Sequence, residues 1–140
     1  MKQWLDAAIE RGAVPVLTGQ NGDMDTIGSA IALAAIHPSL LACGLHLGRV
    51  AKRLVEEMEA PFRKIATHGT VFPDQLGGII IVDAAAPSQV GIDLPEVPRL
   101  IIDHHATNGW KLRDGDYMMQ WDVRATTEMV AAYMFQHAKE

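Results

Sequence analysis

The run Gly78-Ile79-Ile80-Ile81-Val82-Asp83 is almost wholly apolar and β-branched, and the run Leu100-Ile101-Ile102-Asp103 has the same character. Strands that are buried on both faces have this composition, as in parallel sheets that are covered by helices. Both runs end in an aspartate, where we expect the chain to leave the sheet. The two runs therefore predict the buried centre of a parallel sheet.

Apolar periodicity on either side of these runs predicts strands and helices in alternation. Residues 13–18, 41–47 and 117–121 have the pattern of further strands, and residues 26–36, 50–58 and 126–137 have that of helices. Pro38 limits the first of these helices, and an earlier helix is indicated by the apolar stripe Trp4, Leu5, Ala8 and Ile9. This order predicts an α/β fold over residues 1–140: a single domain with a mostly parallel sheet and helices on both faces.

The composition is that of one ordered globular domain. The chain has 140 residues, of which 49% are hydrophobic and 21% charged, which is enough apolar material for a single core. The formal net charge of -5 disfavours sequence-blind binding to a nucleic-acid backbone, which needs a basic face. A small nucleotide or short oligonucleotide held through metal ions remains compatible with this charge.

The single cysteine and the N-terminus bear on the cellular compartment. Cys43 has no cysteine partner and lies in an apolar run, so we expect a packed core thiol. The N-terminus lacks the apolar segment of a signal peptide, and no apolar stretch approaches the about 20 residues that span a bilayer. We therefore expect a reduced, cytoplasmic protein that is not inserted in a membrane.

Acidic residues follow three of the expected strands. The loop after the first strand carries Asp23 and Asp25, while Asp83 and Asp103 end the two most apolar runs. In open α/β sheets the ligand crevice lies beyond the carboxyl ends of the strands, so these carboxylates should share one rim. His104 and His105 follow directly on Asp103.

Such crowding of carboxylates is tolerable when a divalent cation offsets their repulsion. Carboxylates with imidazoles suit Mn²⁺, Mg²⁺ or Zn²⁺, and a carboxylate that bridges two ions would make a hydrolytic two-metal site. Each aspartate taken alone is more simply a turn residue or a helix N-cap. The joint arrangement favours the metal site.

Two small residues, Gly28 and Ser29, fall in the first turn of the helix after Asp25. Small residues there let backbone N–H groups approach an anion at the positive end of the helix dipole. Gly28 would equally allow close packing of the helix on the sheet. The two interpretations are compatible, and both stay open.

These motifs resemble those of the DHH phosphoesterase superfamily, which includes RecJ exonucleases, oligoribonucleases, cyclic-dinucleotide phosphodiesterases and family II inorganic pyrophosphatases. Residues 21–29 are similar to its first motif, residues 80–83 to its second, and Asp103-His104-His105 with Asn108 to the motif that gives the family its name. Residues 121–130 resemble the strand-to-helix stretch that follows in oligoribonuclease relatives.

The resemblance implies a Mn²⁺-type site, with one or two ions, that hydrolyses phosphoric esters or anhydrides. By position, Asp23 would bind one ion, Asp25 the other, Asp83 both, and His105 would be a further ligand. His104 would lie near the leaving group, as an acid or a second ligand, and Asp103 would orient the imidazoles. The residues expected to bind the substrate are Gly28 and Ser29, in the first turn of the helix after Asp25, together with Asn108 and Arg124.

The chain departs from the family pattern in three respects. Gly19 stands where family enzymes carry a metal-ligating histidine, no fourth aspartate motif follows the last expected helix, and the family's C-terminal substrate-binding domain is not represented. Each of two ions would then have about one protein ligand fewer, which predicts weaker metal binding or the loss of one ion. The side chains considered as replacements are His46, His68 and Asp122.

Three functions follow as hypotheses. The first is a metal-dependent phosphoesterase that acts on a nucleotide, a short oligonucleotide or a related small phosphorylated ligand. The second is a catalytically degenerate DHH domain that serves as a binding or scaffold module. The third is half of a site that another chain completes, either in a homo-oligomer or with a different partner.

Overall fold

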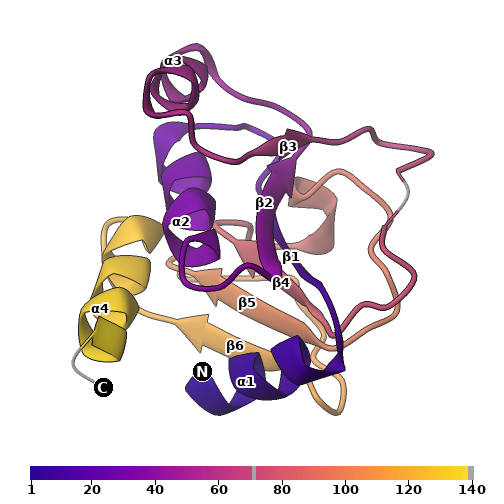
Figure 1. Ribbon diagram of the computed structural model, residues 1–140. Coiled ribbons are helices and arrows are strands. Elements are labelled where there is room, and N and C mark those ends of the chain that lie inside the picture. The colour runs from indigo at the N-terminus through magenta and orange to yellow at the C-terminus, as the bar shows by residue number, and fades with distance from the viewer. Residues whose placement is uncertain (71, 139–140) are drawn as a thin grey trace.

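The computed structural model describes residues 1–70 and 72–138, and these residues form a six-stranded sheet whose strands all run parallel (Figure 1). The strands are β1 Val14–Thr18, β2 Leu40–Gly44, β3 Arg63–Lys64, β4 Ile79–Val82, β5 Arg99–Asp103 and β6 Tyr117–Gln120. The helices are α1 Lys2–Arg11, α2 Met24–Ala34, α3 Arg49–Met58 and α4 Thr126–Ala138, with the short 3₁₀ helix η1 Pro87–Gln89. The predicted parallel α/β fold is confirmed.

The strand order β3-β2-β1-β4-β5-β6 places the reversal of winding between β1 and β4. The register pairs Thr18 with Val82 and Val82 with Ile102, so the last residues of β1, β4 and β5 lie close to one level. Ligands of doubly wound sheets bind at such a reversal, outside the carboxyl ends of the strands. The loops that carry the acidic residues leave the sheet at this edge.

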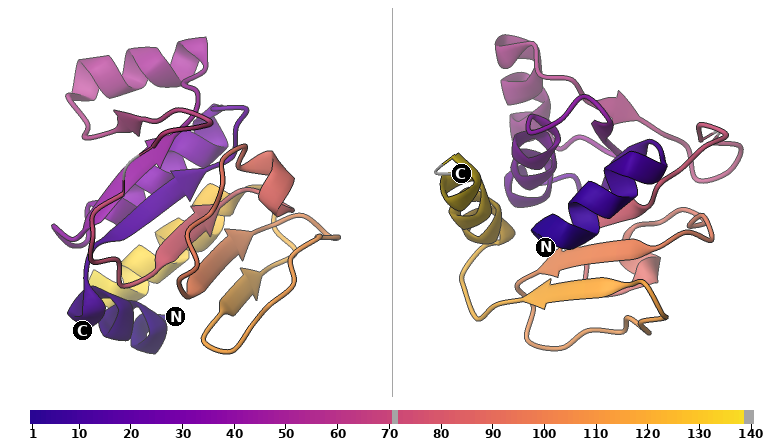
Figure 2. Two further views of the ribbon diagram at one scale, coloured as in Figure 1. Left: turned by 90° about the vertical axis from the view of Figure 1, so that its right-hand side faces the viewer. Right: turned by 60° about the horizontal axis from the view of Figure 1, so that its bottom comes forward.

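The two faces of the sheet are covered differently. One face packs against α1, α2 and α4 through a cluster that includes Leu5, Leu33 and Met129, and α2 and α4 lie side by side there (Figure 2). On the other face, η1 and long loops supply Val90 and Trp110 to the second cluster. Right-handed crossovers that move in opposite directions along a sheet fall on opposite faces, which explains why the β4–β5 and β5–β6 connections lie here.

The second strand is shorter than the expected run 41–47, because β2 ends at Gly44. A Cβ atom on Gly44 would lie 1.9 Å from Thr18 Oγ1, so the strand packs closely on β1 at this point. The chain then turns over the loop that follows β1, where the Gly48 N–H donates to the Gly22 carbonyl at 2.7 Å. The edge strand β3 was not predicted, since two charged residues carry no apolar alternation.

The single cysteine and the helices bear on the expected burial and on membrane insertion. Cys43 is buried in the second cluster, as predicted, and burial raises the pKa of its thiol to about 12. None of the helices within the described ranges is both long and apolar enough to cross a lipid bilayer.

Candidate metal centre at the carboxyl ends of the strands

A cleft of about 520 Å³ opens at the carboxyl ends of the strands. Five of the residues predicted to bind metal or act in catalysis line it: Asp23, Asp25, Asp83, His104 and His105. The remaining lining residues are Gly19, Gln20, Asn21, Gln89, Arg124 and Ala125. The sheet therefore brings together side chains that are up to 82 positions apart, from Asp23 to His105, as the acidic strand ends predicted.

Asp83 is the central carboxylate of the cleft. It follows β4 with φ 60°, in the left-handed region, where an aspartate is tolerated better than a branched residue. Its N–H donates to the Ile102 carbonyl at 2.9 Å, and its Oδ1 accepts from the Thr126 hydroxyl at 3.2 Å. Burial, followed by the negative charge of Asp25, raises the pKa of Asp83 to about 7. Part of this shift therefore reflects the negative charge that Asp25 places beside Asp83.

His104 presents one ring nitrogen to this carboxylate. Its Nδ1 lies 3.2 Å from the Val123 carbonyl, which can only accept, so this nitrogen carries the proton of the neutral ring. The Nε2 lone pair then faces Asp83 Oδ1 at 3.3 Å and Asp25 Oδ2 at 3.7 Å. Histidines that ligate metals are ordinarily oriented in this way by a backbone carbonyl.

His105 is held by the buried aspartate that precedes it in the motif. Its Nδ1 lies 2.6 Å from Asp103 Oδ1, and the Asp103 side chain is 1% exposed. The two histidine rings lie 4.5 Å apart, and the His105 side chain is 43% exposed. Asp103 therefore fixes the His105 ring, while the opposite edge of that ring is open to the cleft or to solvent.

The N-terminus of α4 holds Asp25. Backbone N–H groups of Thr126 and Thr127 donate to its two carboxylate oxygens at 3.0 and 2.9 Å, and the Thr127 hydroxyl adds a third bond at 2.9 Å. Burial alone would raise the pKa of Asp25, but the hydrogen bonds from Thr127 and Thr126 outweigh it, and the pKa lies below the ordinary 3.8. Asp25 therefore ionises at a lower pH than its neighbour Asp83.

Asp23 is the N-cap of α2. Its Oδ1 accepts from the Thr26 N–H at 3.0 Å, and its Oδ2 accepts from the Asn21 amide at 3.0 Å. Asp23 thus has the capping role that is the simpler interpretation of a strand-end aspartate taken alone. Asp23 also lines the cleft, so capping and a place at the rim are both features of this residue.

The donor atoms fit a divalent ion. Asp83, His104 and His105 each offer one ligand atom, and these atoms all lie within 4.8 Å of one another. One carboxylate and two imidazoles are ligands that Mn²⁺ and Zn²⁺ accept readily. The raised pKa of Asp83 supports this fit, because a cation would offset the charge repulsion that causes part of it.

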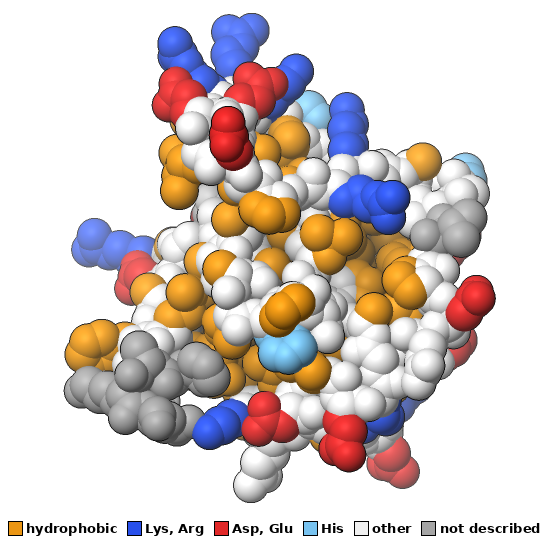
Figure 3. Space-filling view, in the orientation of Figure 1, with side chains coloured by type: hydrophobic (Ala, Val, Ile, Leu, Met, Phe, Trp, Pro, Cys, Tyr) orange, Lys and Arg blue, Asp and Glu red, His pale blue; other side chains and the backbone are white. Residues whose placement is uncertain are grey.

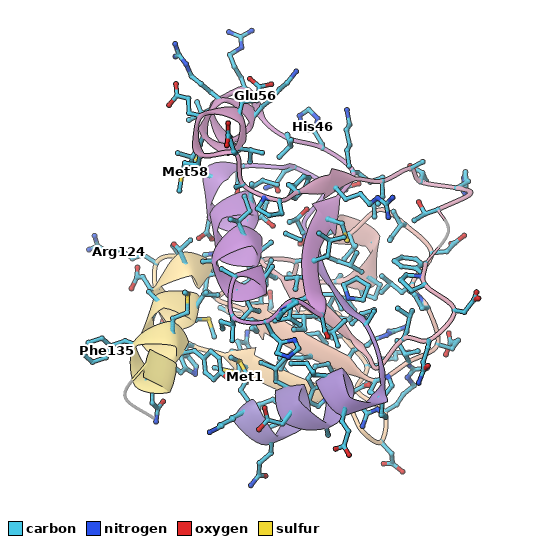
Figure 4. All side chains as sticks on the ribbon, in the orientation of Figure 1. Met1, His46, Glu56, Met58, Arg124 and Phe135 are labelled. Carbon is cyan, nitrogen blue, oxygen red and sulfur yellow. The ribbon has the colours of Figure 1, made fainter. Side chains whose placement is uncertain are left out.

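Three residues expected at the substrate site lie elsewhere than on the cleft wall. Gly28 faces α4, where an added Cβ would meet the Thr127 methyl at 3.7 Å, and buried Ser29 donates its hydroxyl to the Asp25 carbonyl at 2.6 Å. Asn108 accepts from the Trp110 N–H at 3.2 Å and so shapes its own turn. Arg124 does line the cleft, and Figure 4 shows its side chain extending outward from the start of α4.

The side chains considered as replacement ligands are not on the cleft wall either. His46, His68 and Asp122 are absent from its described lining, and Figure 4 shows His46 near α3, far from the Arg124 label. By contrast, Thr126 and Thr127 hold two of the site carboxylates and were not predicted as site residues. The available signal was the pair of threonines at the start of the expected helix 126–137, because threonine is a residue that bonds to other groups at helix N-termini.

The chain belongs to the DHH family, because the N-terminal domain of that family matches residues 13–140. This family comprises divalent-metal-dependent phosphoesterases and pyrophosphatases. Among solved structures, a candidate family II inorganic pyrophosphatase of Methanococcus jannaschii has the same fold, with a TM-score of 0.58 and 22% sequence identity. The match covers 88% of this chain and 38% of the archaeal one, so the chain spans well under half the length of that protein. No curated protein matches this sequence.

Proposed function

We propose that this protein is a divalent-metal-dependent phosphoesterase that hydrolyses a phosphodiester or phosphoanhydride bond in a nucleotide or short oligonucleotide. The observation that carries the proposal is the convergence of Asp83, His104 and His105 donor atoms within 4.8 Å in an open cleft. Membership of the DHH family supports the reaction class.

In this proposal the ion is held by Asp83, His104 and His105, with Asp25 beside them. The family resemblance allows His104 to be an acid or a ligand, and we favour the ligand role because its Nε2 lone pair faces Asp83 and Asp25 at 3.3 and 3.7 Å. A bound divalent ion would neutralise the carboxylates and stabilise charge on the phosphoryl oxygens. We favour Mn²⁺ over Mg²⁺ because two of the three donors are imidazoles.

The other residues of the cleft would position these ligands and the substrate. Asp103 would orient the His105 ring, because its carboxylate lies 2.6 Å from His105 Nδ1. Thr126 and Thr127 would orient the carboxylates of Asp25 and Asp83 by donating hydrogen bonds to them. Arg124 would supply positive charge for a phosphate at the mouth of the cleft. The α4 N–H groups that bind Asp25 are not free to bind a phosphate.

The charge distribution favours a small substrate over a long polyanion. Arg124 is the one lysine or arginine among the described cleft residues. On the face shown in Figure 3, the basic side chains over α3 alternate with acidic ones, and Arg53 pairs with Glu57 at 3.7 Å. A protein that follows a nucleic-acid backbone needs a continuous basic path, which that face lacks.

A binding or scaffold module is the second candidate function. The observation in its favour is Gly19, which brings no side chain to the cleft wall at a position where family enzymes carry a ligand. A site of this kind would retain a phosphorylated ligand without turnover.

Completion of the site by another chain would instead make the specific activity rise with protein concentration.

Calorimetric titration with Mn²⁺, together with hydrolysis of a chromogenic phosphodiester and of pyrophosphate, tests the proposal. We expect Mn²⁺ binding and Mn²⁺-dependent hydrolysis, both of which are lost in Asp83→Asn and His104→Ala. Asp122→Ala is the matched control, because Asp122 is an exposed acidic residue outside the cleft. Binding without hydrolysis of either substrate would favour the binding module, and no binding at millimolar Mn²⁺ would refute the metal-dependent enzyme.

A further inference from the structure

The acidic rim is divided between two unequal groups of donors. On one side, Asp83 and the two histidines converge within 4.8 Å, with Asp25 Oδ2 at 3.7 Å from His104 Nε2. On the other side, Asp23 is the only additional carboxylate that the described cleft residues provide. The two sides therefore differ in how many ligands they can offer to an ion.

Both oxygens of Asp23 already accept hydrogen bonds. The Thr26 N–H occupies Oδ1 as the cap of α2, and the Asn21 amide occupies Oδ2, each at 3.0 Å. The Asn21 N–H₂ thus presents partial positive charge to the oxygen that a cation would otherwise approach. Each oxygen of Asp23 thus has one neutral donor, from the first turn of α2 or from the preceding loop.

Position 19 cannot add a ligand beside Asp23. A Cβ atom on Gly19 would lie 3.0 Å from the Asp83 carbonyl oxygen, 3.3 Å from Asn21 Oδ1 and 3.5 Å from Thr26 Oγ1. The backbone is held there, because the Gly19 N–H donates to Thr26 Oγ1 at 2.8 Å and that hydroxyl donates to the Val82 carbonyl at 3.2 Å. The small residue is therefore part of a tight junction between β1, α2 and β4.

Two of the three amide side chains of the cleft already have partners in their own loops. Gln89 Oε1 accepts from the Ala85 N–H at 2.7 Å, and Asn21 turns its N–H₂ toward Asp23. An ion beside Asp23 would have that residue and a shared Asp83 as its carboxylate ligands. Protein sites for Mn²⁺ or Zn²⁺ ordinarily supply three or more side-chain ligands per ion.

We infer that this chain binds a single divalent ion, on the side of Asp83, His104 and His105, and that Asp23 caps α2 instead of ligating a second ion. The inference rests on the proposed function, because it assumes that the cleft binds metal. It specifies a mononuclear site, so only one ion would be available to contact a bound phosphate.

Asp23→Asn separates capping from ligation. Asparagine caps a helix about as well as aspartate, so α2 should keep its N-terminus, while a carboxylate ligand would be removed. We expect one Mn²⁺ per chain in the unchanged protein, and a Kd for Mn²⁺ that stays within about threefold in Asp23→Asn. Asp83→Asn should lose binding, and thermal unfolding should show that both variants are folded.

Electron paramagnetic resonance of the Mn²⁺-loaded protein gives a second readout. We expect the six-line spectrum of isolated Mn²⁺ at all loadings, without the exchange-coupled signals of a Mn²⁺ pair. Two ions per chain, a coupled spectrum, or a loss of tenfold or more in affinity on Asp23→Asn would overturn the single-ion inference and leave the proposed function standing. If the unchanged protein binds no Mn²⁺, the proposed function fails and this inference fails with it.

Discussion

Asp23, Asp25 and Asp83 share one cleft but have different partners. Asp23 caps α2, Asp25 accepts from the N-terminus of α4, and Asp83 has the Thr126 hydroxyl and the His104 ring. The first two carboxylates accept hydrogen bonds from neutral donors at both oxygens, whereas burial and the negative charge of Asp25 favour the protonated form of Asp83 and raise its pKa to about 7. The environment of each residue therefore decides its chemistry, although the residue type is the same.

The raised pKa of Asp83 predicts how the stability of the metal-free protein depends on pH. The folded-state pKa of about 7 lies above the ordinary 3.8. Between these two pH values the Asp83 carboxyl therefore keeps its proton in the folded protein and loses it in the unfolded chain. The stabilisation from Asp83 is fully present below about pH 4 and is lost as the pH rises through 7. It amounts to at most about 4 kcal/mol, at about 1.4 kcal/mol per pKa unit.

Asp83→Asn isolates this contribution, because asparagine tolerates the left-handed φ of 60° and retains an oxygen for the Thr126 hydroxyl. Urea unfolding in the presence of a chelator should show that the free energy of unfolding of the variant, relative to the unchanged protein, increases between pH 4 and pH 8. A difference that is constant over this range would contradict the prediction. The same residue should make Mn²⁺ affinity rise with pH up to about 7, since binding displaces its proton.

At the scale of elements, the N-terminus of α4 acts as a clamp on the cleft. Thr126 and Thr127 make contacts with Asp25, about a hundred positions earlier in the chain, and with Asp83. The helix itself was predicted from its periodicity, at residues 126–137, and the structure has it at Thr126–Ala138. Its target could not be predicted, because helical periodicity identifies the buried face of a helix but not the group at its end.

The clamp predicts an effect of Thr127→Val on metal binding. Valine keeps the shape and the backbone N–H but removes the hydroxyl that donates to Asp25 at 2.9 Å. We expect a loss of about 0.5–1.5 kcal/mol in stability and of about tenfold or more in Mn²⁺ affinity, as for other residues that orient ligands. Thr127→Ser should restore both, as measured by thermal unfolding and calorimetry.

Thr70→Val is the matched control for this variant, because Thr70 is half-buried like Thr127 and its hydroxyl bonds only to the nearby Ala66 backbone in the described structure. It should leave Mn²⁺ affinity unchanged. Equal losses of affinity in Thr70→Val and Thr127→Val would show that the clamp has no specific role at the cleft.

At the scale of the whole molecule, α1 is joined to the sheet by a very close backbone contact. A Cβ atom on Gly77 would lie 1.7 Å from the Ala8 carbonyl oxygen and 2.9 Å from the Gly12 nitrogen. The Arg11 guanidinium also donates to the Gly77 carbonyl, at 2.9 and 3.0 Å. This contact holds α1 beside β4, at the opposite end of the strand from the cleft.

Two glycine-to-alanine substitutions test this contact. Gly77→Ala should reduce the free energy of unfolding by about 3 kcal/mol, because the obstructing atoms belong to the backbone and cannot rotate away. Gly28→Ala should instead add about 0.5–1 kcal/mol, since it improves a helix and its Cβ meets the Thr127 methyl at an ordinary 3.7 Å. Urea unfolding measures both changes. A destabilising Gly28→Ala would show that α2 and α4 require glycine between them.

The sequence by itself determined the class of fold and the acidic and histidine residues that share the cleft, Asp23, Asp25, Asp83, His104 and His105. Apolar runs that end in aspartate identified β4 and β5, and the alternation of elements indicated a parallel sheet, since both features follow from local burial and from the period of the backbone. The short strand β3, with no apolar pattern, and the end of β2 at Gly44 could not be predicted in this way.

Only the tertiary structure decided what each side chain of the cleft does. Asp23 caps α2, Asp25 accepts hydrogen bonds from the N-terminus of α4, and His104 Nε2 faces Asp83. Ser29 and Asn108, which were expected at the substrate site, bond to backbone groups instead. The bonds of Asp23, Ser29 and Asn108 join groups within four residues of one another, and the residue types alone do not say which of the possible local bonds forms. The contacts of Asp25 and His104 join segments that are distant in the chain. These distant contacts form only when the sheet register brings the ends of β1, β4 and β5 to one level, and no local pattern encodes them.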